Sequence, residues 1–218
     1  MIAAGRVMVD GQKITQPGVK ADPARQEIRV DGQTIKSTEA HEYWMIHKPA
    51  GVVCTVSDPE GRPKVVDLLP DAAKGRLYPV GRLDMYSEGL VLMTNDGELA
   101  YKLTHPRYRV PKYYKVWVEG RPDKRAVNRL RQGVEIEGGA SAPARVHVKS
   151  FKEGMGKLHM VLHEGRKREI RQMCQAIGHP VKRLMRVGLA NLRLDDLPLG
   201  ASRRLTMREL KELRRGLQ

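Results

Sequence analysis

One stretch decides the organisation of this chain: Gly81-Arg82-Leu83-Asp84, followed by Ser87-Glu88-Gly89 and the apolar run Leu90-Val91-Leu92-Met93. The apolar run predicts a buried strand, and the flanking glycines predict a tight turn before it. This turn holds one carboxylate, that of Asp84. Among arginines, a carboxylate is expected to stay ionised and fixed in direction. Asp84 is therefore a candidate nucleophile or base, with a purely structural role in the turn as the alternative.

The chain is 218 residues long and strongly basic, with 40 Lys+Arg against 25 Asp+Glu and a formal net charge of +15. Such an excess is typical of proteins that bind phosphate backbones. No apolar run approaches the length of a bilayer span and no signal-peptide pattern opens the chain, so we expect a cytoplasmic protein that does not bind a membrane. The two cysteines, Cys54 and Cys174, are far apart and predict neither a disulfide framework nor a zinc site.

Residues 1–38 are predicted to form a small unit. Two short strand patterns each end in an Asp-Gly hairpin signal, at Asp10-Gly11 and at Asp31-Gly32. This pattern resembles the second half of the alpha-L RNA-binding motif, in which two helices precede such strands. The residues before Asp10 are too few for both helices. We therefore predict a truncated alpha-L RNA-binding module over 1–38 and a second domain over 39–218.

Strands and helices mix in residues 39–218 without a regular alternation. Interior strands are predicted at 44–47 and 89–94, period-two strands at 113–118, 145–148 and 157–163, and helices at 123–132, 167–177 and after the capping box of Thr206 and Glu209. Antiparallel hairpins with a few packed helices predict an α+β fold, with a mixed, mostly antiparallel sheet and flanking helices.

Two segments far from Asp84 add candidate site residues. In the segment 112–116, Tyr114 lies between basic residues, as in strands that stack a base, but it shares a face with two valines and fits a core position equally well. The basic run 166–168 is predicted at a helix N-terminus, where backbone N–H groups favour anions; a solvated basic face is the alternative. Arg171 follows the buried position Ile170, so its guanidinium is expected to reach into a cleft.

Segments in order over about residues 43–210 resemble the bacterial ribosomal RNA pseudouridine synthases of the RsuA/RluB type. They are Ile46–Gly51 (IHKPAG), Tyr78–Asp84 (YPVGRLD), Thr94–Ala100 (TNDGELA), Leu103–Pro106 (LTHP), Lys112–Val116 (KYYKV), Glu164–Arg166 (EGR) and Glu169–Arg171 (EIR). The resemblance implies a pseudouridine synthase-like fold and an isomerase that needs no cofactor and no metal.

The resemblance also implies roles for individual residues. Asp84 matches the catalytic aspartate, Tyr114 the base-stacking tyrosine, and Arg171 the basic residue that pairs with the aspartate. The residues expected to contact RNA are Lys48, Arg82, Lys112, Arg166, Lys167 and Arg168. Three routes stay open for Asp84: attack at the anomeric carbon, proton abstraction from the ribose, or addition to the pyrimidine ring.

The expected partner is ribosomal RNA, either free or within a pre-ribosomal particle, and the protein is expected to be a monomer. Segments 190–194 and 197–200 look more like the large-subunit enzymes, which favours 23S rRNA as the substrate. Two alternatives remain open. One is a small-subunit 16S rRNA pseudouridine synthase, and the other is a non-catalytic RNA-binding ribosome-assembly factor.

Overall fold

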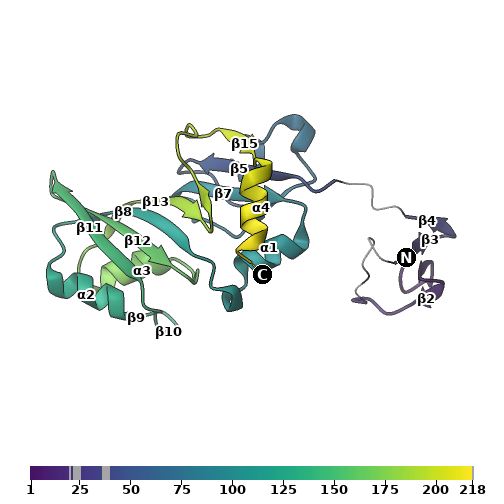
Figure 1. Ribbon diagram of the computed structural model, residues 1–218, viewed down its shortest axis with the longest axis horizontal. Helices are drawn as coiled ribbons and strands as arrows, with labels where there is room; N and C mark the ends of the chain where they lie inside the picture. The colour runs from purple at the N-terminus through teal and green to yellow at the C-terminus, as the bar shows by residue number, and fades with distance from the viewer. Residues whose placement is uncertain (20, 22–25, 36–39, 218) are drawn as a thin grey trace. The chain divides into compact units, whose positions relative to one another are not determined.

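A computed structural model describes residues 1–19, 21, 26–35 and 40–217 of the chain (Figure 1). The chain divides into two compact units, Met1–Ala40 and His41–Gln218. The domain boundary expected from the sequence, between residues 38 and 39, falls in the segment 36–39, which lies outside the described residues.

The first unit contains a four-stranded antiparallel sheet with the strand order β2-β1-β3-β4. Its strands are β1 (Val7–Val9), β2 (Gln12–Ile14), β3 (Ile28–Val30) and β4 (Gln33–Thr34). The two expected Asp-Gly turns join these strands in pairs. Asp10 and Gly11 have φ angles of 48° and 79°, and Asp31 and Gly32 have φ angles of 51° and 78°. Positive φ at both central residues is what a tight two-residue hairpin loop requires.

The second unit is built on a nine-stranded sheet with the order β11-β12-β8-β13-β7-β5-β15, to which β14 and β6 add through β13 and β7. Its strands are β5 (Tyr43–Lys48), β6 (Tyr78–Val80), β7 (Glu88–Thr94), β8 (Lys112–Glu119), β11 (Arg145–Lys152), β12 (Met155–Leu162), β13 (Val181–Leu189), β14 (Leu192–Arg193) and β15 (Ser202–Arg204). Only the β13–β7 pairing is parallel among the described strands. A separate hairpin joins β9 (Glu135–Ile136) to β10 (Gly139–Ala140). The expected α+β class and mostly antiparallel sheet are confirmed.

In the described part of the chain, four α-helices and three short 3-10 helices accompany this sheet. They are α1 (Gly97–Thr104), α2 (Lys124–Gln132), α3 (Glu169–Ala176), α4 (Met207–Arg215), η1 (Val65–Leu68), η2 (Asp71–Ala73) and η3 (Pro106–Tyr108). The capping box of Thr206 and Glu209 is confirmed at the start of α4. Helix α3 begins two residues later than predicted, because Arg168 adopts the left-handed conformation with φ 54°. Among the described residues, no helix is both long enough and apolar enough to cross a membrane.

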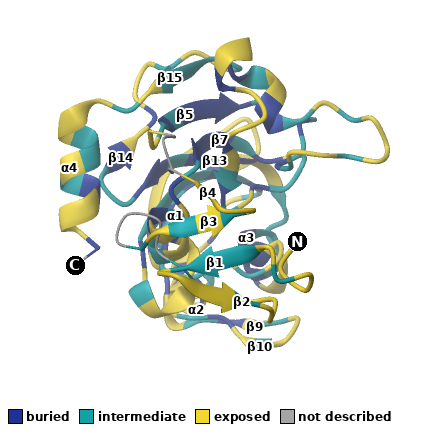
Figure 2. Ribbon diagram, turned by 90° about the vertical axis from the view of Figure 1, so that its right-hand side faces the viewer, coloured by how far each residue is buried: buried dark blue, intermediate teal, exposed yellow. Residues whose placement is uncertain are grey.

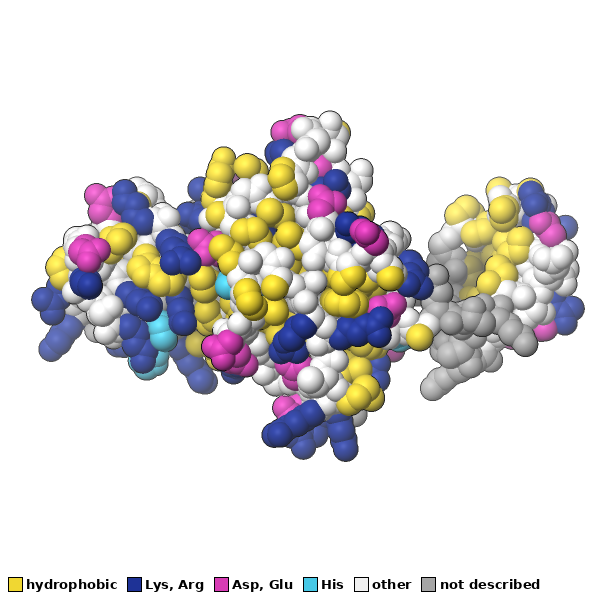
Figure 3. All heavy atoms as spheres, turned by 90° about the horizontal axis from the view of Figure 1, so that it is seen from above, with side chains coloured by type: hydrophobic (Ala, Val, Ile, Leu, Met, Phe, Trp, Pro, Cys, Tyr) yellow, Lys and Arg dark blue, Asp and Glu magenta, His cyan; other side chains and the backbone are white. Residues whose placement is uncertain are grey.

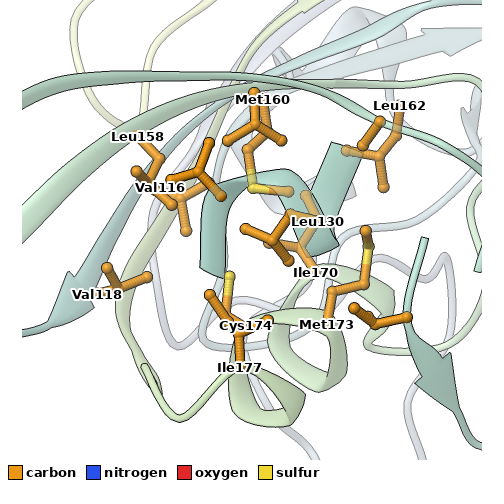
Figure 4. Close-up of a cluster of buried hydrophobic side chains, with 14 of the residues drawn as sticks. Val116, Val118, Leu130, Leu158, Met160, Leu162, Ile170, Met173, Cys174 and Ile177 are labelled. Carbon is orange, nitrogen blue, oxygen red and sulfur yellow. The ribbon is translucent and has the colours of Figure 1, made fainter. Parts of the chain in front are cut away.

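Helices α2 and α3 pack on one face of the sheet, and a hydrophobic core is buried between these helices and the sheet. Figure 4 shows this cluster, in which Met173 and Cys174 of α3 meet Val116 and Met160 of the sheet, all four fully buried. The predicted interior strands β5 and β7 are buried along nearly their whole length (Figure 2). Their burial fixes the loop that precedes β7, which is the loop that contains Asp84.

Gly89 marks a close approach of two strands. It has φ +114°, and a Cβ atom there would lie 2.1 Å from the backbone oxygen of Arg186. We expect Gly89→Ala to lower the free energy of unfolding by about 3 kcal/mol or more, since both the backbone and the contact are strained. Urea denaturation measures this. Gly154→Ala is the control, because Gly154 has φ +74° but no neighbour within 4 Å. Equal losses in both variants would contradict the close approach.

Candidate active site

A cleft of about 740 Å³ lies in the second unit, on the side of the sheet that faces α3. Segments far apart in the sequence form its walls. Predicted site residues that line it are Arg82, Asp84, Lys112, Tyr114, Arg166, Lys167 and Arg168. The structure therefore brings together the loop before β7, strand β8 and the segment before α3, as the sequence predicted.

Asp84 lies at the wall of this cleft with its side chain about one-third exposed (34%). The N–H of Ser87 donates to the backbone carbonyl of Asp84 at 2.9 Å, which closes the tight turn. Its Oδ2 atom lies 3.9 Å from Nε of Arg171. At this distance Asp84 and Arg171 form an ion pair but no hydrogen bond, so the carboxylate of Asp84 stays available to a substrate.

Arg171 anchors the loop that holds Asp84. Its side chain is only 15% exposed. Its Nη2 atom donates to the carbonyl of Tyr86 at 3.2 Å and to Oγ of Ser87 at 3.4 Å, whereas its buried Nε has no hydrogen-bond partner. Burial, followed by the nearby Arg168, lowers the pKa of Arg171, and Asp84 counteracts this. A free N–H beside a carboxylate can form a closer contact when a substrate fills the cleft.

Tyr114 combines the two placements that the sequence left open, a position in the core and a position facing the site. It is half-buried on β8, where it packs against two hydrophobic cores, and it also lines the cleft. Burial raises the pKa of its phenol, and Arg186, which is its cross-strand partner on β13, acts in the opposite direction. The ring is thus held at the floor of the cleft by packing from behind.

Arg186 is a site residue that the sequence interpretation missed. It is 3% exposed and lines the cleft. Its Nε donates to the carbonyl of Leu90 at 2.8 Å, and its buried Nη2 has no hydrogen-bond partner. A signal for it exists in the sequence, because Arg186 stands two residues after the buried Leu184 and so shares the inward face of a strand. A buried arginine at such a position indicates a functional or structural contact.

Lys48 is not placed as predicted. It was expected to contact RNA, but it is fully buried at 0% exposure. Its ammonium donates to the carbonyls of Pro49, Val52 and Met85 at 2.9, 2.7 and 3.2 Å. Burial lowers the pKa of this ammonium. The physical cause is that carbonyls of two loops converge around the Lys48 ammonium, which donates to all three, while the carbonyl of Met85 also accepts from the N–H of Gly51 at 2.9 Å.

Lys48→Met should therefore change stability and turnover rather than RNA affinity. Three carbonyls would lose the Lys48 ammonium, although that of Met85 keeps the N–H of Gly51, and we expect the free energy of unfolding to fall by about 2 kcal/mol. The rate constant kcat should also fall, because Met85 directly follows Asp84. Urea denaturation, steady-state kinetics and RNA binding test this, with the exposed Lys124 changed to Met as the control. A loss of RNA affinity at unchanged stability would restore the original prediction.

The remaining basic residues fall into two groups. Arg166 is half-buried and donates to the carbonyls of Glu137, Gly139 and Ala140 at 2.5, 3.0 and 3.0 Å, so it fastens the β9–β10 hairpin. Lys112 is also half-buried, and burial lowers its pKa. By contrast, three cleft residues are exposed to solvent. They are Arg82, Lys167 and Arg168.

A pair of glutamates beside the cleft was also missed. Glu169 is 4% exposed, and its side chain accepts from the N–H of Arg166 at 3.1 Å. Glu164 accepts from the N–H of Ala142 at 2.8 Å and shares a hydrogen bond with Glu169. Burial, and next the hydrogen bond with Glu164, raise the pKa of Glu169 to about 8, while this hydrogen bond lowers the pKa of Glu164. A protonated Glu169 that donates to an ionised Glu164 satisfies both groups.

This pair should make stability depend on pH. Glu169 stays protonated in the folded protein up to pH about 8, whereas in the unfolded chain it ionises near its ordinary value of 4.5. The free energy of unfolding should therefore fall as the pH rises between these values. Glu164 contributes a constant amount across this window, because its pKa is lowered. Glu169→Gln should flatten the profile measured by urea denaturation. An unchanged slope in this variant would contradict the assignment.

A sequence model described as RNA pseudouridylate synthase matches residues 42–176, the part of the chain that contains Asp84, Tyr114 and Arg171. The chain belongs to the RNA pseudouridylate synthase family. The resemblance noted from the sequence motifs is thus confirmed at the level of the family.

Individual relatives cover nearly the whole chain of this pseudouridine synthase. It is 40% identical over 216 residues to the "Ribosomal large subunit pseudouridine synthase B" of Bacillus subtilis, covering 98% of this chain and 87% of the relative. It is 37% identical to an "Uncharacterized RNA pseudouridine synthase" of Aquifex aeolicus, covering 98% and 85%. A crystal structure of a pseudouridylate synthase superposes with a TM-score of 0.74 at 26% identity, covering 97% and 90%.

Proposed function

We propose that this enzyme converts a specific uridine of large-subunit ribosomal RNA to pseudouridine, with Asp84 as its catalytic carboxylate. One observation supports the site assignment above all others. Asp84, Tyr114 and Arg171 come from three distant segments of the chain, and they lie at or beside one cleft whose rim is basic. A carboxylate repels phosphate, so its place in such a cleft is explained by chemistry on the nucleoside rather than by RNA binding.

The reaction is an isomerisation. The bond between the uracil nitrogen and the ribose breaks, the base turns, and a new bond joins ribose to carbon; that carbon loses its proton and the nitrogen gains one. The target base must first leave its stack, at a cost of a few kcal/mol. Stacking on Tyr114 recovers about 1–3 kcal/mol, and phosphate contacts from Lys167 and Arg168 add to it.

Asp84 acts at the sugar or at the base, and Arg171 fixes the orientation of its carboxylate. The guanidinium of Arg171 donates to the carbonyl of Tyr86 and to Oγ of Ser87 and lies beside Oδ2 of Asp84, so the carboxylate keeps one direction as the base enters. Arg186 lies beside Tyr114 on the neighbouring strand β13 and lines the same cleft. In this arrangement the protein supplies the carboxylate, the stacking surface and the anchoring cations from its own side chains.

The substrate assignment follows from the relatives and not from the cleft. The Bacillus subtilis relative is named for the ribosomal large subunit, and the strong positive charge of this chain, +15, fits a polyanionic partner. We propose further that the protein acts in the cytoplasm as a monomer, on rRNA that is free or part of a pre-ribosomal particle.

The decisive experiment is incubation of the purified protein with unmodified large-subunit and small-subunit rRNA, each free and in partly assembled particles, followed by pseudouridine mapping. We expect one modified position, in the large-subunit rRNA. If only the small-subunit rRNA were modified, the substrate would be small-subunit rRNA and not large-subunit rRNA. Tight binding without modification of any of these RNAs would favour a non-catalytic assembly factor.

A further inference from the structure

The sheet of the second unit has a second basic face, opposite the catalytic cleft. Side chains of a strand alternate between its faces, so on β8 Tyr114 lines the cleft while Lys115 and Trp117 point away from it. Cross-strand neighbours extend this face over β11, β12 and β13. We call it the open face, and define it by Lys115, Trp117, His147, Lys157, His159 and Arg183.

The cations of the open face are organised around one ring. Lys157 and Arg183 flank Trp117, with their charged groups 5.1 and 4.8 Å from its ring centroid. Arg183 is also held by Glu88 through contacts of 2.7–3.2 Å. Cations held in this way keep their charge at a fixed place and lose little side-chain freedom when an anion binds.

Positive charge dominates the centre of this face. Lys115 and His159 are cross-strand partners, and His159 is paired in turn with His147. Desolvation, followed by Lys149, Lys115 and Lys157, lowers the pKa of His159, as expected in a field of like charges. Because Lys149 acts on His159 in this way, its charge lies close to the open face. Within the second unit, helices α2 and α3 pack on the other side of these strands.

The open face is also visible as a patch on the surface. Figure 3 shows Lys, Arg and His side chains gathered at the left-hand end of the second unit, where β8, β11 and β12 lie. His147 and Lys149 are exposed, and Lys115 and Lys157 are partly exposed. In the described part of the chain, none of these three lysines has an ion pair with an acidic side chain. Their charges are thus available to a phosphate backbone.

We propose that the open face binds the phosphate backbone of a second segment of ribosomal RNA, separate from the strand that holds the target uridine. The inference rests on the proposed function. The sheet itself lies between the cleft and the open face, so a short strand bound in the cleft does not reach both. A folded RNA that wraps around the edge of the sheet at β11 reaches both the cleft and the open face. Because Trp117 is already covered by two cations, the recognition is by charge rather than by base stacking.

The test compares two triple variants that remove the same charge. One is Lys115→Gln, Lys149→Gln and Lys157→Gln on the open face. The matched control is Lys124→Gln, Arg125→Gln and Lys211→Gln, three exposed residues on α2 and α4. Each is assayed on a short hairpin with the mapped target uridine and on the intact large-subunit rRNA, and thermal unfolding verifies that both variants fold as the wild type does.

We expect the open-face variant to modify the hairpin at the wild-type rate, and to bind the intact rRNA about ten-fold more weakly, with a salt slope reduced by about 2–3. The control variant should keep both activities and both affinities. Equal losses on the hairpin and the intact rRNA, or no loss on either, would overturn the proposal.

Direct binding keeps this inference separate from the proposed function. If the wild-type protein modifies neither RNA, the proposed function fails. Filter binding of the intact rRNA to the wild type and to both triple variants still decides whether the open face contacts RNA. A difference between the two triple variants supports the surface, and identical affinities overturn it.

Discussion

Replacing Asp84 by asparagine should reduce pseudouridine formation by at least about 10³-fold, because an amide neither attacks carbon nor accepts a proton as a carboxylate does. The affinity for RNA should change little or rise slightly, since the variant removes a negative charge from a basic cleft. Single-turnover assays on the mapped substrate, together with filter binding, measure the two quantities separately.

Asp71→Asn is the matched control. Asp71 is an exposed aspartate in η2 whose partner is Lys74, so the same chemical change there should leave turnover intact. Appreciable turnover by the Asp84 variant would remove Asp84 from the catalytic role. A parallel loss of RNA binding and turnover would show instead that this aspartate supports the shape of the cleft.

The second large effect is expected at Arg171. Arg171→Ala removes the guanidinium beside Oδ2 of Asp84 and the donor that holds Tyr86 and Ser87. We expect kcat to fall by about 10²-fold or more while KM changes little, because a misplaced carboxylate still permits binding but seldom reacts. Steady-state kinetics on the hairpin substrate measure this split.

The variant Arg171→Lys separates the orienting effect of the guanidinium from the effect of its positive charge. Lysine keeps the positive charge but lacks the planar fork that spans both the carboxylate and the backbone. It should therefore recover only a small part of kcat. Full recovery by lysine would reduce the role of Arg171 to simple charge, and unchanged kinetics in the alanine variant would remove its role altogether. Urea denaturation shows whether a loss of folding explains either result.

Local signals predicted much of the fold because they depend on neighbouring residues. The Asp-Gly pairs predicted both hairpin turns of the first unit, and the Thr206–Glu209 capping box predicted the start of α4. Period-two alternation on β8 predicted that Tyr114 shares a face with two valines, and it packs against the core that contains Val116 and Val118. The alpha-L character of the first unit and the catalytic roles of individual residues stay predictions.

Burial of charged residues could not be predicted in the same way. Lys48 looks like a surface lysine in the sequence, but carbonyls from two loops surround it, and one of them, that of Met85, is 37 residues away. The protonation of Glu169 likewise depends on Glu164 and on its almost complete burial. Such effects arise where distant segments remove water from a charge, so that no short window of the sequence contains them.

The sequence by itself determined the hairpin turns of the first unit, five strands of the second unit, most of the helix ends, the basic character of the protein, and the motifs that indicate its family. It did not reveal β13, the strand at the centre of the sheet. The tertiary structure alone decided which cations are exposed in the cleft and which hold the loops. It also placed Met185 and Arg186 beside Glu88 and Gly89, through the parallel pairing of β13 with β7. The physical reason is one of range: alternation and capping act between near neighbours, whereas desolvation and charge pairing act between segments that meet only in the folded protein.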